Sequence, residues 1–242
     1  MSGPTSWTAA IVRDPVHGPL PGLLFLLTAV TGVIDAVSLL VLGRVFVANV
    51  TGTLVALGLA LAGTPGIVRE TALAALAAFV VGAHLGGKMI ARFGGHRGWL
   101  LTWMTAVELA FVLAATPVAA PLTVSVTPET SVSAVVAAAL LAFGMGIQNA
   151  AVRRLKVPDI TTTVVTMAVT GLAADERGGG RDPLLRRLLA VLMLLAGAAL
   201  GALLVLRAGP AWALAVAVLM IATVLAVAAL SSRVPQDWHA PR

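Results

Sequence analysis

Residues 20–53 read LPGLLFLLTAVTGVIDAVSLLVLGRVFVANVTGT, and this stretch decides the fold. Its first part, Pro21–Leu42, is an apolar run with one charged residue, Asp35. About 20 apolar residues cross a bilayer as a helix, so this run predicts a membrane span. The second part opens a shorter apolar segment, Phe46–Ala62, which contains the polar string Asn49-Val-Thr51-Gly-Thr53. This segment is at the lower limit for crossing a membrane.

The composition of the whole chain agrees with that interpretation. Hydrophobic residues make up 59% of the 242 residues and charged residues 11%, whereas soluble domains hold about 45–50% and about 25%. A soluble fold could not bury that much apolar surface, so a soluble enzyme, a DNA-binding module and a disordered chain are all excluded. The chain contains no cysteine, which excludes disulfides, Cys-ligated metals and a thiol nucleophile.

Eight apolar segments follow one another, and six of them have the length of a membrane span. We therefore expect one transmembrane domain over 20–230, preceded by a cytoplasmic segment, 1–19, and followed by a tail, 231–242. The long segments are Pro21–Leu42, Ile67–Ala91, Trp99–Ala115, Ser131–Val152, Leu184–Leu206 and Ala211–Leu230, and the short ones are Phe46–Ala62 and Ile160–Ala173.

The chain also repeats itself. A shift of 115 positions places Gly82-Ala-x-Leu-Gly86 on Gly197-Ala-x-Leu-Gly201, and a shift of 114 places Gly32 on Gly146. The sequence thus predicts an all-α polytopic membrane protein with two internal repeats, about 20–116 and 131–230. Each repeat would hold three long helices and one short helix. Internal repeats are common in transporters, although duplication also occurs in membrane proteins without a transport role.

The basic residues favour a topology in which neither short segment crosses. Six spans place 13 of the 16 Lys and Arg residues on the side of the amino terminus and leave Arg44, Arg69 and Arg207 opposite, whereas eight spans divide them equally. Seven spans retain the bias but make the two halves unequal. Because Lys and Arg stay on the cytoplasmic side, we expect six spans with both termini in the cytoplasm. Three spans per half give an inverted repeat with re-entrant short helices.

Polar residues inside the spans are the candidate site, because lipid cannot satisfy them. Asp35 in the first half is matched by Gln148 and Asn149 in the second. Two inverted halves would bring these residues together near the bilayer midplane, where the amino ends of the short helices would favour a polar or anionic ligand. The predicted ligand-binding residues are Asp35, Asn49, Thr51, Gln148, Asn149 and Thr166.

Other interpretations of these residues stay open. Asp35 is equally explained as an interior carboxyl that is hydrogen-bonded to a neighbouring helix. Asn and Thr at a helix start also cap their own helix or pack helices together. Glu108 lies within a span, and we expect it to join Asp35 as a candidate for charge coupling.

The glycines Gly82, Gly86, Gly197 and Gly201 form two small-x-x-x-small faces, which predict close helix packing. The four histidines are dispersed, so no metal site is expected. Motifs of enzymes and nucleotide-binding loops are missing from the sequence, so we expect neither enzymatic activity nor a cofactor.

Three motifs together resemble those of the YoaK-like bacterial membrane proteins, which carry domain of unknown function 1275. They are Gly32-Val-Ile-Asp-Ala36, Phe46-Val-Ala-Asn-Val-Thr-Gly52 and Gly146-Ile-Gln-Asn-Ala150. The resemblance covers about 20–230. This chain departs from the usual family pattern at Thr53 and Met167, where Asn and Gly are common. The resemblance implies a polytopic protein of the bacterial inner membrane and indicates no substrate.

The leading functional hypothesis is a small secondary transporter for a small polar or anionic solute. The alternative is a non-transporting scaffold or partner subunit that acts through helix–helix contacts. In both cases the lipid bilayer is the main partner and nucleic acid is not expected. A homodimer is expected because six spans are few for a transporter.

Overall fold

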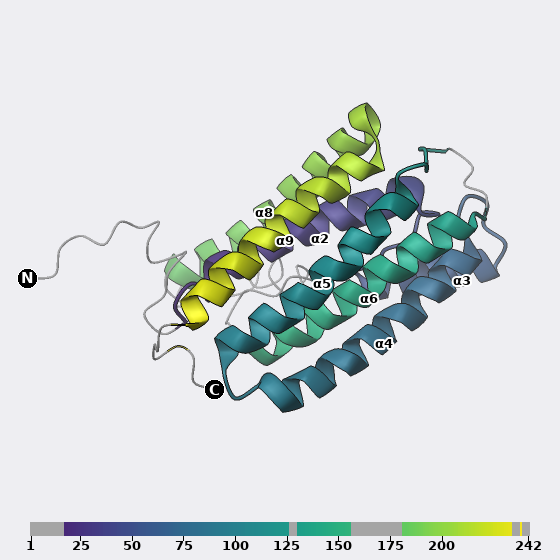
Figure 1. The fold of residues 1–242 in the computed structure, drawn as a ribbon. Helices are drawn as coiled ribbons and strands as arrows, with labels where there is room; N and C mark the ends of the chain where they lie inside the picture. Colours follow the sequence, from purple (N-terminus) through teal and green to yellow (C-terminus); the bar gives the residue numbers. More distant parts are fainter. Residues whose placement is uncertain (1–16, 126–129, 156–180, 234–237, 239–242) are drawn as a thin grey trace, which may run out of the picture.

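The computed structural model describes residues 17–125, 130–155, 181–233 and 238, which are all-helical apart from turns and connections (Figure 1). Six of the helices are long and apolar enough to cross a membrane, so the polytopic all-α prediction is confirmed. The segment Ile160–Ala173, with Thr166, lies outside the described residues. The helices are α2 (Leu20–Val41), α3 (Val50–Leu61), α4 (Arg69–Phe93), α5 (Arg97–Ala119), α6 (Val132–Leu155), α8 (Arg181–Ala208) and α9 (Pro210–Ser232).

Burial distinguishes the inner helices from the outer ones. Most residues of α2 are buried, including a continuous run from Leu27 to Ile34. In α4 only a narrow stripe is buried, and large apolar side chains such as Val80 and Val81 are exposed on its outer face. Lipid tails accept such a face, whereas water would not. The outer faces of α4 and α8 therefore fit contact with the bilayer.

The helices α4 and α6 pack along each other through glycine. A Cβ atom built on Gly82 would collide with the backbone carbonyl of Phe143, and one built on Gly146 would lie 2.8 Å from the backbone nitrogen of Ala83. One turn further along, a Cβ on Gly86 would lie 2.6 Å from the Cβ of Ala150. Small residues let two backbones approach this closely in a membrane, where no hydrophobic effect drives helices together.

The helices α2 and α8 repeat this arrangement. A Cβ atom on Gly197 would collide with the carbonyl of Ala29, one on Gly201 would lie 2.8 Å from the Cα of Val33, and one on Gly32 would lie 2.6 Å from the nitrogen of Ala198. In both pairs, residues further along one helix contact residues further along the other. α2 therefore runs parallel to α8, and α4 runs parallel to α6.

The short helix α3 does not carry the chain across the bundle. The N–H of Val68, just before α4, donates to the carbonyl oxygen of Gly43, just after α2, at 3.2 Å. The chain between these residues therefore leaves one end of the bundle and returns to the same end, where α3 packs against α4 (Figure 1). The structure corrects the predicted start of the short segment, because Phe46 lies in an irregular limb, residues 43–49, and α3 begins at Val50.

Basic side chains gather at the opposite end of the bundle. There α5 begins beside the end of α6, because a guanidinium nitrogen of Arg97 donates to the carbonyl of Leu155. The other end, near α3, carries Arg44, Arg69 and Arg207. At the end away from α3, the basic residues in the terminal helix turns, or just beyond them, are Lys88, Arg92, Arg97, Arg153, Arg154, Arg186, Arg187 and Arg233.

The α4–α6 crossing predicts opposite effects for two glycines on one helix. Gly82→Ala should destabilise the protein, because the backbone of α6 blocks the new methyl group, and overpacking of this kind costs about 1–3 kcal/mol. Gly87→Ala meets nothing within 4 Å and should leave stability equal or slightly higher. Thermal unfolding of both purified variants in detergent checks this, and equal melting temperatures would contradict the crossing.

The return of the chain to one end predicts the labelling of single cysteines. The chain has none of its own, so the background is clean. Thr64→Cys and Arg44→Cys flank the short helix and should react with a membrane-impermeant maleimide from the same side. Gly95→Cys, in the exposed turn between α4 and α5, should react only from the other side. Labelling of Arg44→Cys and Thr64→Cys from opposite sides would show that α3 crosses the membrane.

Candidate functional site

Asp35 holds the chain that follows α2. One of its carboxylate oxygens accepts hydrogen bonds from the backbone N–H groups of Val47, at 3.1 Å, and Ala48, at 3.0 Å. Asp35 lies six residues before the end of α2, which is about 9 Å along the helix axis. The limb 43–49 therefore folds back into the bundle alongside the last turns of α2. Unpaired N–H groups at that depth would be costly, and the carboxylate removes that cost.

Two hydroxyl groups fix the same limb. Ser38, one turn beyond Asp35, donates to the carbonyl of Val45 at 2.7 Å. Thr53 of α3 donates to the carbonyl of Phe46 at 2.6 Å. Side chains of the two flanking helices thus pair with two backbone donors and two backbone acceptors of the limb, which supports its irregular conformation inside the bundle.

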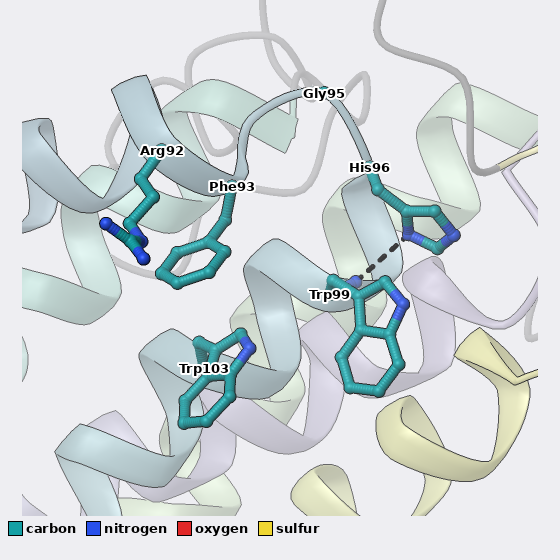
Figure 2. Close-up of a pocket in the computed structure, with 6 residues that line it drawn as sticks. All are labelled: Arg92, Phe93, Gly95, His96, Trp99 and Trp103. Atoms are coloured by element: carbon teal, nitrogen blue, oxygen red, sulfur yellow. Dashed lines mark hydrogen bonds between the residues drawn. The ribbon is translucent and has the colours of Figure 1, made fainter.

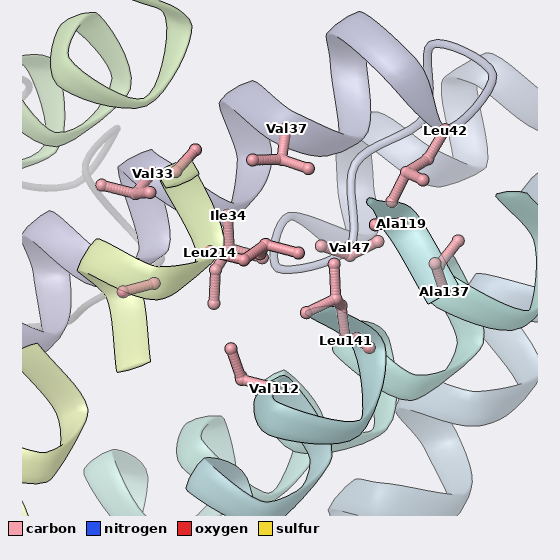
Figure 3. Close-up of a cluster of buried hydrophobic side chains, with 14 of the residues drawn as sticks. Val33, Ile34, Val37, Leu42, Val47, Val112, Ala119, Ala137, Leu141 and Leu214 are labelled. Atoms are coloured by element: carbon pink, nitrogen blue, oxygen red, sulfur yellow. The ribbon is translucent and has the colours of Figure 1, made fainter. Parts of the chain in front are cut away.

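The side chains of the limb fill the space between the two halves. Val45, Val47 and Ala48 are buried. Val47 belongs to the hydrophobic cluster that also contains Leu141 of α6 and Leu214 of α9, as Figure 3 shows. The limb therefore packs against helices of the second half as well as its own.

The limb leads directly into the amino end of α3. The side-chain oxygen of Asn49 accepts a hydrogen bond from the N–H of Gly52 at 3.3 Å, so Asn49 caps this helix. Asn49 and Thr51 are both exposed. The structure therefore places these two predicted site residues at the surface of the chain, whereas Asp35 is partly buried with the limb.

In the second half, Gln148 is buried and connects α6 to α2. Its amide nitrogen lies 3.4 Å from the hydroxyl oxygen of Thr31, which precedes Asp35 by one helical turn. Asn149 donates to the carbonyl of Met145 at 2.9 Å within its own helix. The structure thus brings Gln148 to within about one turn of Asp35, along the same face of α2.

Glu108 of α5 is the other polar group in the interior. Its side chain is 1% exposed and lies beside α6, where a Cβ atom on Gly144 would be 3.6 Å from its Cγ. Among the described residues, one carboxylate oxygen of Glu108 and the side-chain oxygen of Gln148 have no hydrogen-bond partner. Gln148 follows Gly144 by one turn of α6. Two unpaired acceptors therefore lie beside neighbouring turns of α6, one at its contact with α5 and one at its contact with α2.

The sequence reasoning missed Thr31 and Ser38, and it noted Thr53 in the polar string without placing it among the ligand-binding residues. Thr31 and Ser38 lie four residues before and three residues after Asp35, the spacing at which helix residues share a face. This spacing in the sequence could have identified Thr31 and Ser38 as neighbours of Asp35. Thr166 lies outside the described residues, and the described residues contain no group of three potential metal ligands.

Six apolar spans, a short helix that enters and leaves at one end, and polar groups inside the bundle define a polytopic α-helical membrane protein. Comparison with known sequences then identifies the family. The profile of the family described as "Protein of unknown function (DUF1275)" matches residues 23–227, and the chain belongs to this family.

A similar protein supports the same family assignment. The chain is 31% identical over 156 residues to the UPF0700 transmembrane protein YoaK of Bacillus subtilis (strain 168), an alignment that covers 64% of this chain and 67% of YoaK. The resemblance seen in the sequence motifs is thereby confirmed. No solved structure matches the chain.

Because Asp35 accepts two backbone hydrogen bonds, we expect the oxygen acceptor of its side chain to matter more to the fold than its charge. Asp35→Ala leaves two buried N–H groups without an acceptor, at about 1–3 kcal/mol each. In a Val47→Cys background, this change should speed thiol labelling at position 47, because the limb loosens. Asp35→Asn keeps an oxygen acceptor and should label as slowly as the parent. Val80→Cys, already exposed, is the control that should not change. Equal labelling of position 47 in the Ala and Asn variants would refute the anchoring role.

Proposed function

We propose that this protein is a small secondary transporter for a small polar or anionic solute. The observation that carries the proposal is the re-entrant hairpin formed by the irregular limb 43–49 and α3. Irregular backbone at membrane depth is tolerated only where protein or a water-filled cavity surrounds it, and such interrupted segments are typical of the substrate sites of transporters.

The arrangement of the two halves supports the same proposal. α4 runs opposite to α2, because the end of α2 is hydrogen-bonded to the start of α4. α6 is parallel to α4 and therefore also runs opposite to α2, its counterpart in the first half. We infer that the halves are inverted copies. The glycine contacts of α4 with α6 correspond, position by position under the shifts of 114 and 115, to those of α8 with α2.

The interior polar groups supply the chemistry that transport needs. Glu108 and Gln148 each present an oxygen that could accept a hydrogen bond from a solute or help to bind a coupling cation. A carboxyl group in this apolar setting is costly when charged, so a change of its protonation state is coupled strongly to its surroundings. In this proposal Glu108 and Asp35 provide the charge coupling, and Gln148 contacts the solute.

The distribution of basic residues sets the orientation in the proposal. The end of the bundle at which α4 finishes and α5 begins holds most of the basic side chains. We assign this end to the cytoplasm by the positive-inside rule. The hairpin then opens toward the outer face of the bacterial inner membrane, and both termini lie in the cytoplasm.

Transport by the purified protein tests the proposal. The protein would be reconstituted into liposomes that contain a pH-sensitive dye and then exposed to gradients of chloride, nitrate, phosphate, acetate, lactate and glycine. Dye fluorescence reports proton-coupled movement, and currents on a supported membrane report net charge. We expect at least one solute to give a signal that Glu108→Gln largely abolishes while the melting temperature stays near that of the parent, because the amide retains the shape of the carboxyl.

Thr223→Val is the matched control. Thr223 is the repeat counterpart of Glu108 and is exposed, with its hydroxyl donating to Leu219 of its own helix. It should transport like the parent. If folded protein moved none of these solutes, or if Glu108→Gln transported as well as the parent, the transport proposal would fail. The scaffold hypothesis would then gain.

A further inference from the structure

A shallow pocket of about 470 Å³ lies at the corner where α4 ends and α5 begins (Figure 2). It is distinct from the interior polar groups and lies at the basic end of the bundle. Three aromatic rings and two basic or titratable side chains surround it. The lining residues are Arg92, Phe93, Gly95, His96, Trp99 and Trp103.

The aromatic rings are held in place by one another and by the helix start. Phe93 of α4 stacks on Trp103 of α5 with ring centroids 5.7 Å apart. The ring nitrogen Nδ1 of His96 accepts a hydrogen bond from the N–H of Trp99 at 3.1 Å, which caps α5. The pocket is therefore built from two helices and the turn between them.

Charge in the pocket is positive. The guanidinium carbon of Arg92 lies 5.7 Å from the centroid of the Phe93 ring, so the cation sits beside the aromatic wall. Lys88 precedes Arg92 by one turn of α4 and is exposed like it. Among the described residues that line the pocket, none is acidic. An anionic group would meet attraction here and no opposing carboxylate.

The pocket is also open to the outside of the bundle. Trp99 is 38% exposed and Trp103 is 48% exposed. Trp side chains in membrane proteins lie at the level of the lipid headgroups, where one part of the ring is apolar and the N–H is polar. A ligand that combines an anionic group with an apolar chain would match both the cation and the exposed rings.

The second half of the chain offers an internal comparison. The shift of 115 places Arg92 on Arg207, but places Phe93, His96, Trp99 and Trp103 on Ala208, Ala211, Leu214 and Val218. The basic residue is thus present at both turns, whereas the aromatic wall is present at only one. A wall that served helix packing alone would have an equivalent need at the other turn.

We propose that this pocket binds one anionic phospholipid. The lipid phosphate lies against Arg92 and Lys88, and the start of an acyl chain lies across Trp99 and Trp103. The pocket volume accommodates a headgroup and the first part of a chain, and the rest of the lipid stays in the bilayer. Basic pockets between helices on the cytoplasmic side bind anionic headgroups in this way. The site is independent of any transport activity.

Native mass spectrometry of the purified full-length protein tests this proposal. The protein would be mixed with equal amounts of phosphatidylglycerol and phosphatidylcholine of the same chain length, and the lipid-bound species counted. We expect a preference for one phosphatidylglycerol. Arg92→Gln should lower that occupancy about fivefold, the change that corresponds to the roughly 1 kcal/mol contributed by one basic side chain at a membrane surface. Trp103→Leu should lower the occupancy of both lipids.

Two variants at the opposite end serve as matched controls. Arg207→Gln removes an exposed arginine at the end of α8, and Trp212→Leu removes a tryptophan that is 63% exposed at the start of α9. Both should bind phosphatidylglycerol like the parent. Equal retention of the two lipids by the parent would overturn the proposal. So would an equal loss in Arg92→Gln and Arg207→Gln, which would indicate a general charge effect. Addition of free inorganic phosphate should not displace the lipid, and displacement would show that the pocket recognises phosphate alone.

Discussion

Every backbone N–H group inside a membrane needs a hydrogen-bond acceptor. In this protein one carboxylate supplies that acceptor where the chain is not helical, just after α2. Asp35 accepts two hydrogen bonds from the irregular limb that follows α2. Without these bonds the limb could not remain among the helices, because lipid offers its backbone nothing. This arrangement determines where α3 lies. It also determines where α4 begins, because the N–H of Val68 before α4 is bonded to the carbonyl of Gly43 after α2. The charged residue within the first span is thus explained by the backbone it holds, and any role in coupling would be added to that structural role.

Close backbone contacts at glycine hold the helices of the two halves together, in addition to the buried apolar side chains. Gly82 and Gly146 at one crossing, and Gly197 and Gly32 at the other, bring backbone against backbone. Each crossing joins a helix of the first half to a helix of the second. The limb adds a third connection, because Val47 packs among side chains of α6 and α9. The polar interior near Gln148 and Glu108 therefore lies within a frame to which both halves contribute.

Much of this architecture could be predicted from the sequence, because membrane spans are recorded in local composition. The six long helices begin and end within a few residues of their predicted bounds, and the largest shift is at α5, which continues through Pro117 to Ala119. The irregular limb 43–49 could not be predicted in the same way. Phe46, Val47 and Ala48 are apolar and look like the start of a helix, whereas the backbone of Val47 and Ala48 is held by Asp35, 12 and 13 residues earlier. Hydrogen bonds over that distance leave no periodic pattern. The surface position of Asn49 and Thr51 escaped prediction for a related reason, since the direction in which a short helix leaves the bundle depends on tertiary packing.

The pairing of helices also has a consequence for how the protein is made. α2 packs against α8, and α4 packs against α6, so the long helices of the first half have their closest partners in the second half. During synthesis the first half enters the membrane well before those partners exist. Its glycine faces and the carboxyl group of Glu108 must therefore wait, in contact with lipid or with the insertion machinery, until α6 and α8 of the second half have been made. The two halves should be poor folding units when separated, and the order of translation leaves the first half as the part most dependent on assistance.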